Sequence, residues 1–175
     1  MKIECPTCQT GYTAERMGIQ LTDATVKFTP GGAIKTDLQG FYKIDLPKPW
    51  TGTINAEYPG CVMAPAVVTL SVQATDHSGL TFTCQDVQSP TAQITAPRNN
   101  GTIGRTAMLR VDVADNIAVV KVVWSLDGTP IGTVAAAPWS LPYKFGRLRA
   151  WHMLTATAYD AADNSATSSV RFKVQ

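Results

Sequence analysis

The sequence predicts an all-β protein made of two tandem β-sandwich domains, residues 1–88 and 89–175. Short apolar runs recur at roughly ten-residue spacing with turn signals between them, as in sandwiches. One stretch, residues 119–132, has the pattern of a complete hairpin. The halves also differ in charge: residues 1–88 hold 6 Lys/Arg and 8 Asp/Glu (−2), whereas residues 89–175 hold 9 and 5 (+4). This asymmetry supports two domains.

The hairpin lies in the stretch from Val119 to Gly132. Apolar residues fall on one face at period two, whereas polar residues and the apolar Val123 fall on the other. The apolar face consists of Val120, Val122, Trp124 and Leu126. Asp127-Gly128 is a strong turn signal, because glycine takes positive φ at little steric cost. We therefore expect two strands joined by a tight turn.

Alternating runs predict the remaining strands. In the first half their apolar faces are Val26 and Phe28; Tyr42, Ile44 and Leu46; Ile54, Ala56 and Tyr58; Val68, Leu70 and Val72; and Leu80, Phe82 and Cys84. Pro59-Gly60 and Pro65 predict a short loop that carries Cys61. In the second half the faces are Leu109, Val111 and Val113; Leu154, Ala156 and Ala158; and Val170, Phe172 and Val174. Residues 138–143 are too rich in proline for a central strand.

Residues 22–85 resemble transthyretin-like or carboxypeptidase-regulatory β-sandwich repeats. The resemblance rests on three motifs: residues 36–42 (TDLQGFY), residues 50–54 (WTGTI) and residues 58–65 (YPGCVMAP). The usual first strand of these repeats is poorly matched, because a Cys-Pro-Thr-Cys segment, residues 5–8, occupies that region.

Residues 90–175 resemble bacterial immunoglobulin-like domains. The matching pieces are residues 97–101, 114–119, 124–132, 137–139 and 158–166. The resemblance implies an Ig-like sandwich that is not itself catalytic and that serves as a spacer or adhesive module on bacterial surface proteins, secreted enzymes or phage virions. The Cys…Trp…Cys framework of antibody domains is missing, since all four cysteines lie in the first half.

Composition and motifs exclude several function classes. No run approaches the roughly 18 apolar residues of a membrane span, and the start shows no signal-peptide core. A net charge of +2 is too small to indicate nucleic acid. Asp76-His77-Ser78 lies within one turn, whereas triad members converge from separate elements. We expect no enzyme, and we expect His152 to be structural and partly exposed.

The cysteines allow three interpretations. Cys5, Cys8, Cys61 and Cys84 could bind zinc as four thiolates, with Cys5 and Cys8 at the C-x-x-C spacing of zinc knuckles. Disulfides would require an oxidising compartment, and free buried thiols are the third interpretation. In the second half, Asp115-Asn116, Asp160 and Asp163-Asn164 could hold calcium, although Asx turns explain the same residues.

One connection carries an aromatic and basic run that could bind a ligand. Its candidate binding residues are Trp139, Tyr143, Lys144, Arg147 and Arg149. Such a run could stack on a glycan, dock on a partner subunit or contact an anionic surface. The alternative is a connection whose aromatic residues cap the sandwich and whose basic residues are solvated.

These observations predict a non-enzymatic structural or adhesive surface protein. The first hypothesis is a phage virion component, either a capsid decoration protein or a tail or fibre accessory, whose partners are capsid or tail proteins or further copies of itself. Reduced cysteines, and possible zinc binding, belong to this hypothesis. The alternative is a glycan-binding or spacer module of a secreted adhesin or glycanase, which is secreted or located at the bacterial cell surface. This alternative predicts that the cysteines form disulfides and that the partners are cell-surface glycans.

Overall fold

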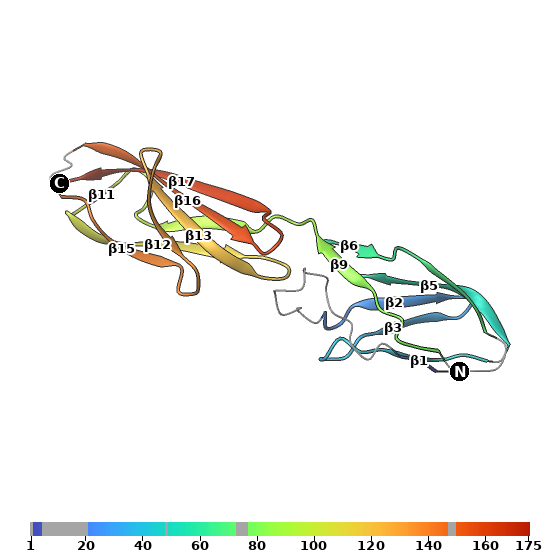
Figure 1. Ribbon diagram of the computed structural model, residues 1–175. Coiled ribbons are helices and arrows are strands. Elements are labelled where there is room, and N and C mark those ends of the chain that lie inside the picture. Colours follow the sequence, from blue (N-terminus) through green and yellow to red (C-terminus); the bar gives the residue numbers. More distant parts are fainter. Residues whose placement is uncertain (1, 5–20, 48, 73–76, 147–149) are drawn as a thin grey trace. The chain divides into compact units, whose positions relative to one another are not determined.

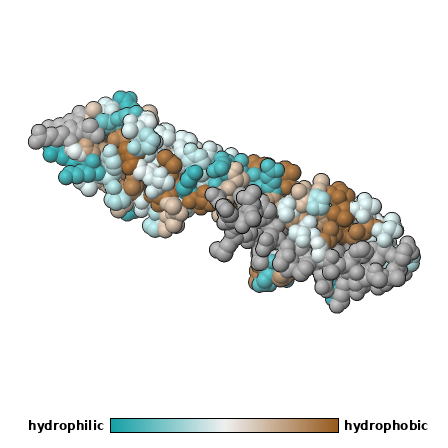
Figure 2. Space-filling model, in the orientation of Figure 1, coloured by the Kyte–Doolittle hydropathy of each residue, from teal (hydrophilic) through white to brown (hydrophobic). Residues whose placement is uncertain are grey.

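The computed structural model describes residues 2–4, 21–47, 49–72, 77–146 and 150–175 (Figure 1). These residues form strands joined by turns, with no helix among them, which confirms the predicted all-β class. In particular, this part of the chain has no helix long and apolar enough to cross a membrane. The chain divides into two compact units, Met1–Val87 and Gln88–Gln175, and each unit has its own buried core. On the visible surface of each unit, hydrophilic and hydrophobic residues are interspersed (Figure 2).

The strands of unit 1 form three small sheets. They are β1 (Lys2–Glu4), β2 (Thr25–Thr29), β3 (Gly32–Lys35), β4 (Lys43–Asp45), β5 (Trp50–Glu57), β6 (Cys61–Ala64), β7 (Val68–Val72), β8 (His77–Ser78) and β9 (Thr83–Asp86). The sheet orders are β3-β2-β5-β7, β4-β1-β8 and β6-β9. Inward residues of β2, β4 and β5 and the residues just before β4 and β9, such as Val26, Ile54, Tyr42 and Phe82, form the core.

Two strands of unit 1 differ from the sequence prediction. Cys61 lies not in a loop but in β6, which pairs antiparallel with β9. The turn signals of Pro59-Gly60 and Pro65 therefore delimit a four-residue strand between them. Gly32–Lys35, which has little alternation of its own, becomes β3 because it pairs residue by residue with β2. In both cases a partner strand, not local periodicity, determines the structure.

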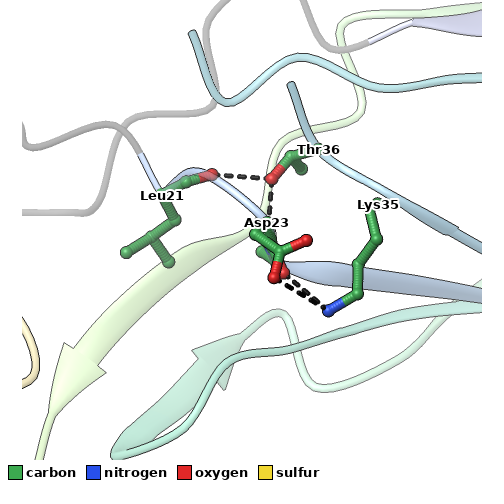
Figure 3. Close-up of polar contacts among 5 residues, drawn as sticks. Leu21, Asp23, Lys35 and Thr36 are labelled. Carbon is green, nitrogen blue, oxygen red and sulfur yellow. Dashed lines mark hydrogen bonds and ion pairs between the residues drawn. The ribbon is translucent and has the colours of Figure 1, made fainter. Parts of the chain in front are cut away.

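Thr36 ties the start of the described part of unit 1 to the end of β3. Its hydroxyl donates to Leu21 O at 2.7 Å and accepts from Ala24 N at 2.9 Å (Figure 3). On the same segment, Lys35 Nζ donates to Asp23 O at 2.8 Å and lies 3.5 Å from a carboxylate oxygen of Asp23. The lysine and aspartate are exposed, whereas Thr36 is 8% exposed, so the buried hydroxyl contributes most to this junction.

Unit 2 is a sandwich of a five-stranded and a three-stranded sheet. Its strands are β10 (Thr91–Ala96), β11 (Gly101–Ile103), β12 (Thr106–Ala114), β13 (Val119–Leu126), β14 (Thr129–Val134), β15 (Ser140–Lys144), β16 (Trp151–Asp160) and β17 (Ser165–Val174). The sheet orders are β11-β17-β16-β13-β14 and β10-β12-β15. Inward residues of both sheets, including the fully buried Leu109, Trp124 and Phe172, form one core.

The predicted hairpin is β13-β14. Val122, Trp124 and Leu126 are buried on the inner face, and the turn residues Asp127 and Gly128 have φ of 50° and 81°. Positive φ at both positions defines the turn type that matches the twist of paired strands. The expected inward position of Val120 is wrong: the pairing with β16 is irregular between Val119 and Lys121, and this bulge breaks the alternation.

The aspartates considered for calcium shape turns. Asp115 Oδ2 accepts from Ile117 N and Ala118 N, and Asp160 Oδ1 accepts from Ala162 N and Asn164 N, all at 2.8–3.0 Å. These are Asx-turn contacts. Although the carboxylate oxygens of Asp115 and Asp160 lie within 4.8 Å of each other, the backbone contacts account for the positions of both side chains.

Candidate functional site

The structure places three of the five predicted binding residues, Trp139, Tyr143 and Lys144, in different surroundings. Tyr143 is half-buried against the core of unit 2, where its ring meets Phe145 edge-on at 4.9 Å. Lys144 is exposed on the outer face of β15. Trp139 lies just before β15, half-buried, and lines a groove. Arg147 and Arg149 lie outside the described residues.

The groove lies on the three-stranded sheet of unit 2 and has a volume of about 720 Å³. That volume is within the roughly 300–1,000 Å³ of small-ligand sites. Besides Trp139, its lining includes Met108, Arg110 and Asp112 of β12, and Thr95 of β10. The lining therefore combines one aromatic ring, one thioether and several groups that can form hydrogen bonds.

The register of two strands positions the polar side chains. Leu109 and Val111 of β12 point into the core, so Met108, Arg110 and Asp112 point outward. Pairing of β12 with β15 sets Arg110 opposite Ser140, and Val111 N donates to Trp139 O at 3.3 Å. Trp139 is thereby aligned with the Arg110–Asp112 segment.

Arg110 and Asp112 are available to a ligand. Both are exposed, and neither forms an ion pair within the described part of the chain. Sequence reasoning missed both, since an Arg-x-Asp alternation on a strand is usually a solvated face. Only the distant pairing with β15 reveals that an aromatic residue lies beside it.

The partial burial of Trp139 fixes the position of its side chain. The side chain packs against the core of unit 2 and also lines the groove. The indole is therefore held by the protein before any ligand arrives, so little conformational entropy is lost on stacking. The other sequence interpretation, aromatic residues that cap the sandwich, is correct for Tyr143 and partly so for Trp139.

Cys61 and Cys84 form a disulfide that joins β6 to β9, with their Cα atoms 5.2 Å apart. A sulfur in a disulfide is no longer a thiolate, so these two residues are not zinc ligands in this state. For Cys61 and Cys84 the structure therefore favours the disulfide interpretation over the site of four zinc-binding thiolates. Cys5 and Cys8 lie outside the described residues.

Unit 1 contains an apolar cavity of about 20 Å³, lined by residues such as Val26, Tyr42 and Phe82. It has room for about one water molecule. Tyr42 donates to Leu80 O at 2.7 Å, and burial raises the pKa of its phenol above the usual value. This cavity is too small for an organic ligand.

His152 is buried, with 8% of its surface exposed, which corrects the expectation of partial exposure. Its Nδ1 atom lies 2.6 Å from Asp127 Oδ2. Partial burial of Asp127 would raise the pKa of its carboxyl. The hydrogen bonds from His152 and from Met153 N, together with the charge of His152, outweigh that effect and hold the pKa below its usual value.

Comparison with known proteins shows what the second unit is similar to. Residues 90–170 match the family model of the bacterial Ig domain. Among solved structures, the fibronectin(III)-like modules of Clostridium thermocellum CbhA are 25% identical. The match covers 49% of this chain and 97% of that one, with a TM-score of 0.44.

Two further solved structures match over a longer part of the chain. A DUF3823 family protein from Bacteroides ovatus is 10% identical, with coverage of 99% and 98% and a TM-score of 0.36. A Ca²⁺-stabilized adhesin with which an Antarctic bacterium binds ice is 18% identical, with a TM-score of 0.31. This match covers 91% of the present chain but 42% of the adhesin. No curated protein matches the chain. The family match over residues 90–170 makes unit 2 similar to bacterial Ig-like β-sandwiches, which are typically non-catalytic structural or adhesive modules of surface or secreted proteins.

Proposed function

We propose that the chain is an adhesive module that binds neutral glycans through the groove of unit 2, as part of a secreted or surface-attached protein. The observation that carries this proposal is the alignment of Trp139 with Arg110 and Asp112 in one groove. Of the three ligand classes suggested by the aromatic and basic run, the proposal chooses glycans.

The groove has the chemistry that a sugar ring needs. A hexose presents an apolar face of C–H groups, which packs on an indole, and an edge of neighbouring hydroxyls. A carboxylate accepts from such hydroxyls and a guanidinium donates to them, and hydrogen bonds to charged groups are the stronger ones. Arg110 and Asp112 carry opposite charges, so the pair favours an uncharged ligand over an ionic one.

The disulfide in unit 1 supports a location outside the cytoplasm. Disulfides persist in oxidising environments and are rare where thiols are kept reduced. The Cys61–Cys84 bridge therefore favours the secreted or surface hypothesis over a reduced, zinc-binding protein. The role as a phage virion subunit stays a prediction. It requires co-purification with particles through capsid or tail proteins, whereas the secreted role requires the purified chain itself to bind glycans.

A glycan array followed by isothermal titration calorimetry tests the groove. We expect Asp112→Ala and Arg110→Ala to weaken binding about 10-fold or more, because each removes a charged hydrogen-bonding partner worth about 1.5–3 kcal/mol. Both side chains are exposed, so the variants keep the fold. Trp139→Ala should abolish binding.

Trp151→Ala is the matched control, since Trp151 is 44% exposed on the other sheet of the same unit. Neutral-glycan binding that survives both Trp139→Ala and Asp112→Ala would contradict the groove proposal. Failure of the wild-type chain to bind any neutral glycan would contradict the proposed function itself.

A further inference from the structure

The five-stranded sheet of unit 2 exposes an outer face whose charged side chains are all positive. Its basic residues are Lys121 on β13 and Arg171 and Lys173 on β17. None of the three forms an ion pair with a carboxylate in the part of the chain that is described. Three neighbouring strands, β13, β16 and β17, make up most of this face (Figure 1).

The acidic residues of unit 2 are all placed elsewhere. Residues 89–175 contain five of them. Asp112 lies on the three-stranded sheet, and Asp115 shapes the turn after β12. Asp127 and Asp163 are turn residues with positive φ. Asp160 ends β16 with 1% exposure. None of these carboxylates therefore forms an ion pair with a cation of the face, although Asp127 borders it where it accepts from Met153 N.

At each end of β16 a cationic side chain lies over an aromatic ring. The guanidinium carbon of Arg171 lies 4.4 Å from the Trp151 ring centroid, and Lys121 Nζ lies 4.7 Å from that of Tyr159. Such contacts contribute about 0.5–1 kcal/mol at exposed sites and restrain a flexible cation. Trp151 remains 44% exposed and its neighbour Met153 45% exposed, so the ring also offers an apolar surface.

Two rows of hydroxyl groups lie between these ends. Thr155 Oγ1 lies 3.0 Å from Ser169 Oγ, and Thr157 Oγ1 lies 3.0 Å from Thr167 Oγ1. Each hydroxyl has one donor and two acceptor positions, so a paired row still offers one hydrogen and several lone pairs outward. The centre of the face can therefore form hydrogen bonds with a ligand that has many hydroxyl groups.

We infer that this face binds an extended acidic polysaccharide. From Trp151 to Tyr159 the strand spans eight residues, or roughly 26 Å at 3.3 Å per residue. Three cations over that length suit a polymer with one carboxylate on each sugar. Double-stranded DNA carries one charge per roughly 1.7 Å and demands a denser basic surface. The sugar faces stack on Trp151 while their hydroxyls meet the threonine and serine rows.

This site is separate from the groove in place and in ligand. The groove lies on the other sheet and pairs a cation with a carboxylate, whereas this face holds cations alone. An extended polymer on a flat sheet also needs no cavity. The two proposals therefore stand or fall independently.

The probe is polygalacturonate, which has one carboxylate per sugar, and its neutral control is the same polymer fully methyl-esterified. Binding of the full chain is measured by biolayer interferometry at 50 and 200 mM NaCl. We expect the wild type to bind polygalacturonate, to lose affinity severalfold at the higher salt because counterions are released, and to bind the ester at least 10-fold more weakly.

Arg171→Glu combined with Lys173→Glu should reduce the affinity for polygalacturonate at least 10-fold. The matched control, Arg105→Glu with Lys144→Glu, makes the same change in charge and residue type at exposed positions beside the other sheet, and should stay within twofold of wild type. Trp151→Ala should also weaken binding, and Arg171→Lys should largely retain it. Thermal melting confirms that each variant is folded.

Several outcomes would overturn the inference. Equal losses in the two double variants would show that net charge alone attracts the polymer. Equal affinity for the methyl ester would remove the role of the carboxylates. Tighter binding to duplex DNA or to phosphatidylserine vesicles at the same salt would assign the face to another class of partner.

Discussion

His152 Nδ1 lies 2.6 Å from Asp127 Oδ2, and this contact joins β16 to the turn between β13 and β14. The same aspartate accepts from Met153 N through its other oxygen at 2.8 Å, and its own N donates to Met153 O at 2.8 Å. A residue with φ of 50° is therefore fixed by three contacts to the neighbouring strand. The hairpin turn is thus part of the fold of unit 2 and not a free tip.

Acid should weaken this turn. The pKa of Asp127 in the folded protein is held below its usual value, which is about 3.9 in unfolded chains. A lowered folded pKa adds stability above the unfolded pKa, and that stability is lost as the pH falls through the folded pKa. We expect the Tm of unit 2 to fall below about pH 4, and Asp127→Asn to remove part of that fall while lowering Tm at pH 6.

Calorimetry between pH 2 and 6 measures this dependence. Asp163→Asn is the control, because Asp163 is also a turn aspartate with positive φ, of 64°, but forms no hydrogen bond or ion pair within the described residues. Identical pH profiles for wild type and Asp127→Asn would contradict a role for the Asp127–His152 contact in acid stability.

The disulfide should stabilise unit 1 alone. Cys61 and Cys84 are 23 residues apart, and a loop of that size predicts a contribution of about 3 kcal/mol. Replacing both with serine should lower the guanidinium midpoint of unit 1 and leave that of unit 2 unchanged, since residues 88–175 contain no cysteine. Denaturation followed by hydrogen exchange separates the two units.

Intact-mass measurements check the state of the cysteines directly. Reduction should reveal the Cys61–Cys84 bridge as a gain of two hydrogens. Loss of one zinc ion on adding a chelator to a protein without that bridge would instead restore the four-thiolate hypothesis.

The sequence was sufficient wherever local pattern determines structure. Alternation placed Val122, Trp124 and Leu126 in the core, and Asp127-Gly128 set the turn. The sequence pattern was insufficient where the pairing of strands that are distant in the sequence determines the structure. Cys61 became part of a strand because β6 aligns with β9, and that same register brings Cys61 and Cys84 within bonding distance. Before the register is known, two isolated cysteines are compatible with free thiols, a disulfide or zinc binding.

The candidate sites show the same limit. Trp139 stands out in the sequence, but its companions Arg110 and Asp112 lie about thirty residues earlier and are ordinary outward residues of a strand. Likewise, the charge of the five-stranded face emerges only when β13 and β17 are placed on either side of β16. Spacing along the chain carries no signal for residues that strand order brings together.

Gly52 should tolerate no side chain. A Cβ atom there would lie 2.2 Å from Thr29 O and 2.5 Å from the Trp50 ring, whose Nε1 donates to Pro30 O at 2.9 Å. Because backbone and a fixed ring would both have to move, we expect Gly52→Ala to cost about 1–3 kcal/mol. Gly32→Ala is the control, since its Cβ would meet Phe28 at 3.7 Å. Equal midpoints in chemical denaturation would contradict this account of the Trp-x-Gly-Thr motif.

The hydroxyl of Thr36 should matter more than its methyl group. Thr36→Val keeps the shape but leaves Leu21 O without its donor and Ala24 N without its acceptor, at a buried position. Each unsatisfied buried group costs about 1–3 kcal/mol, so we expect unit 1 to lose at least 1 kcal/mol. Thr36→Ser keeps both hydrogen bonds and removes one methyl, worth about 0.8 kcal/mol. Urea denaturation of unit 1 ranks the three proteins. A valine variant more stable than the serine variant would show that packing, and not the hydroxyl, holds this junction together.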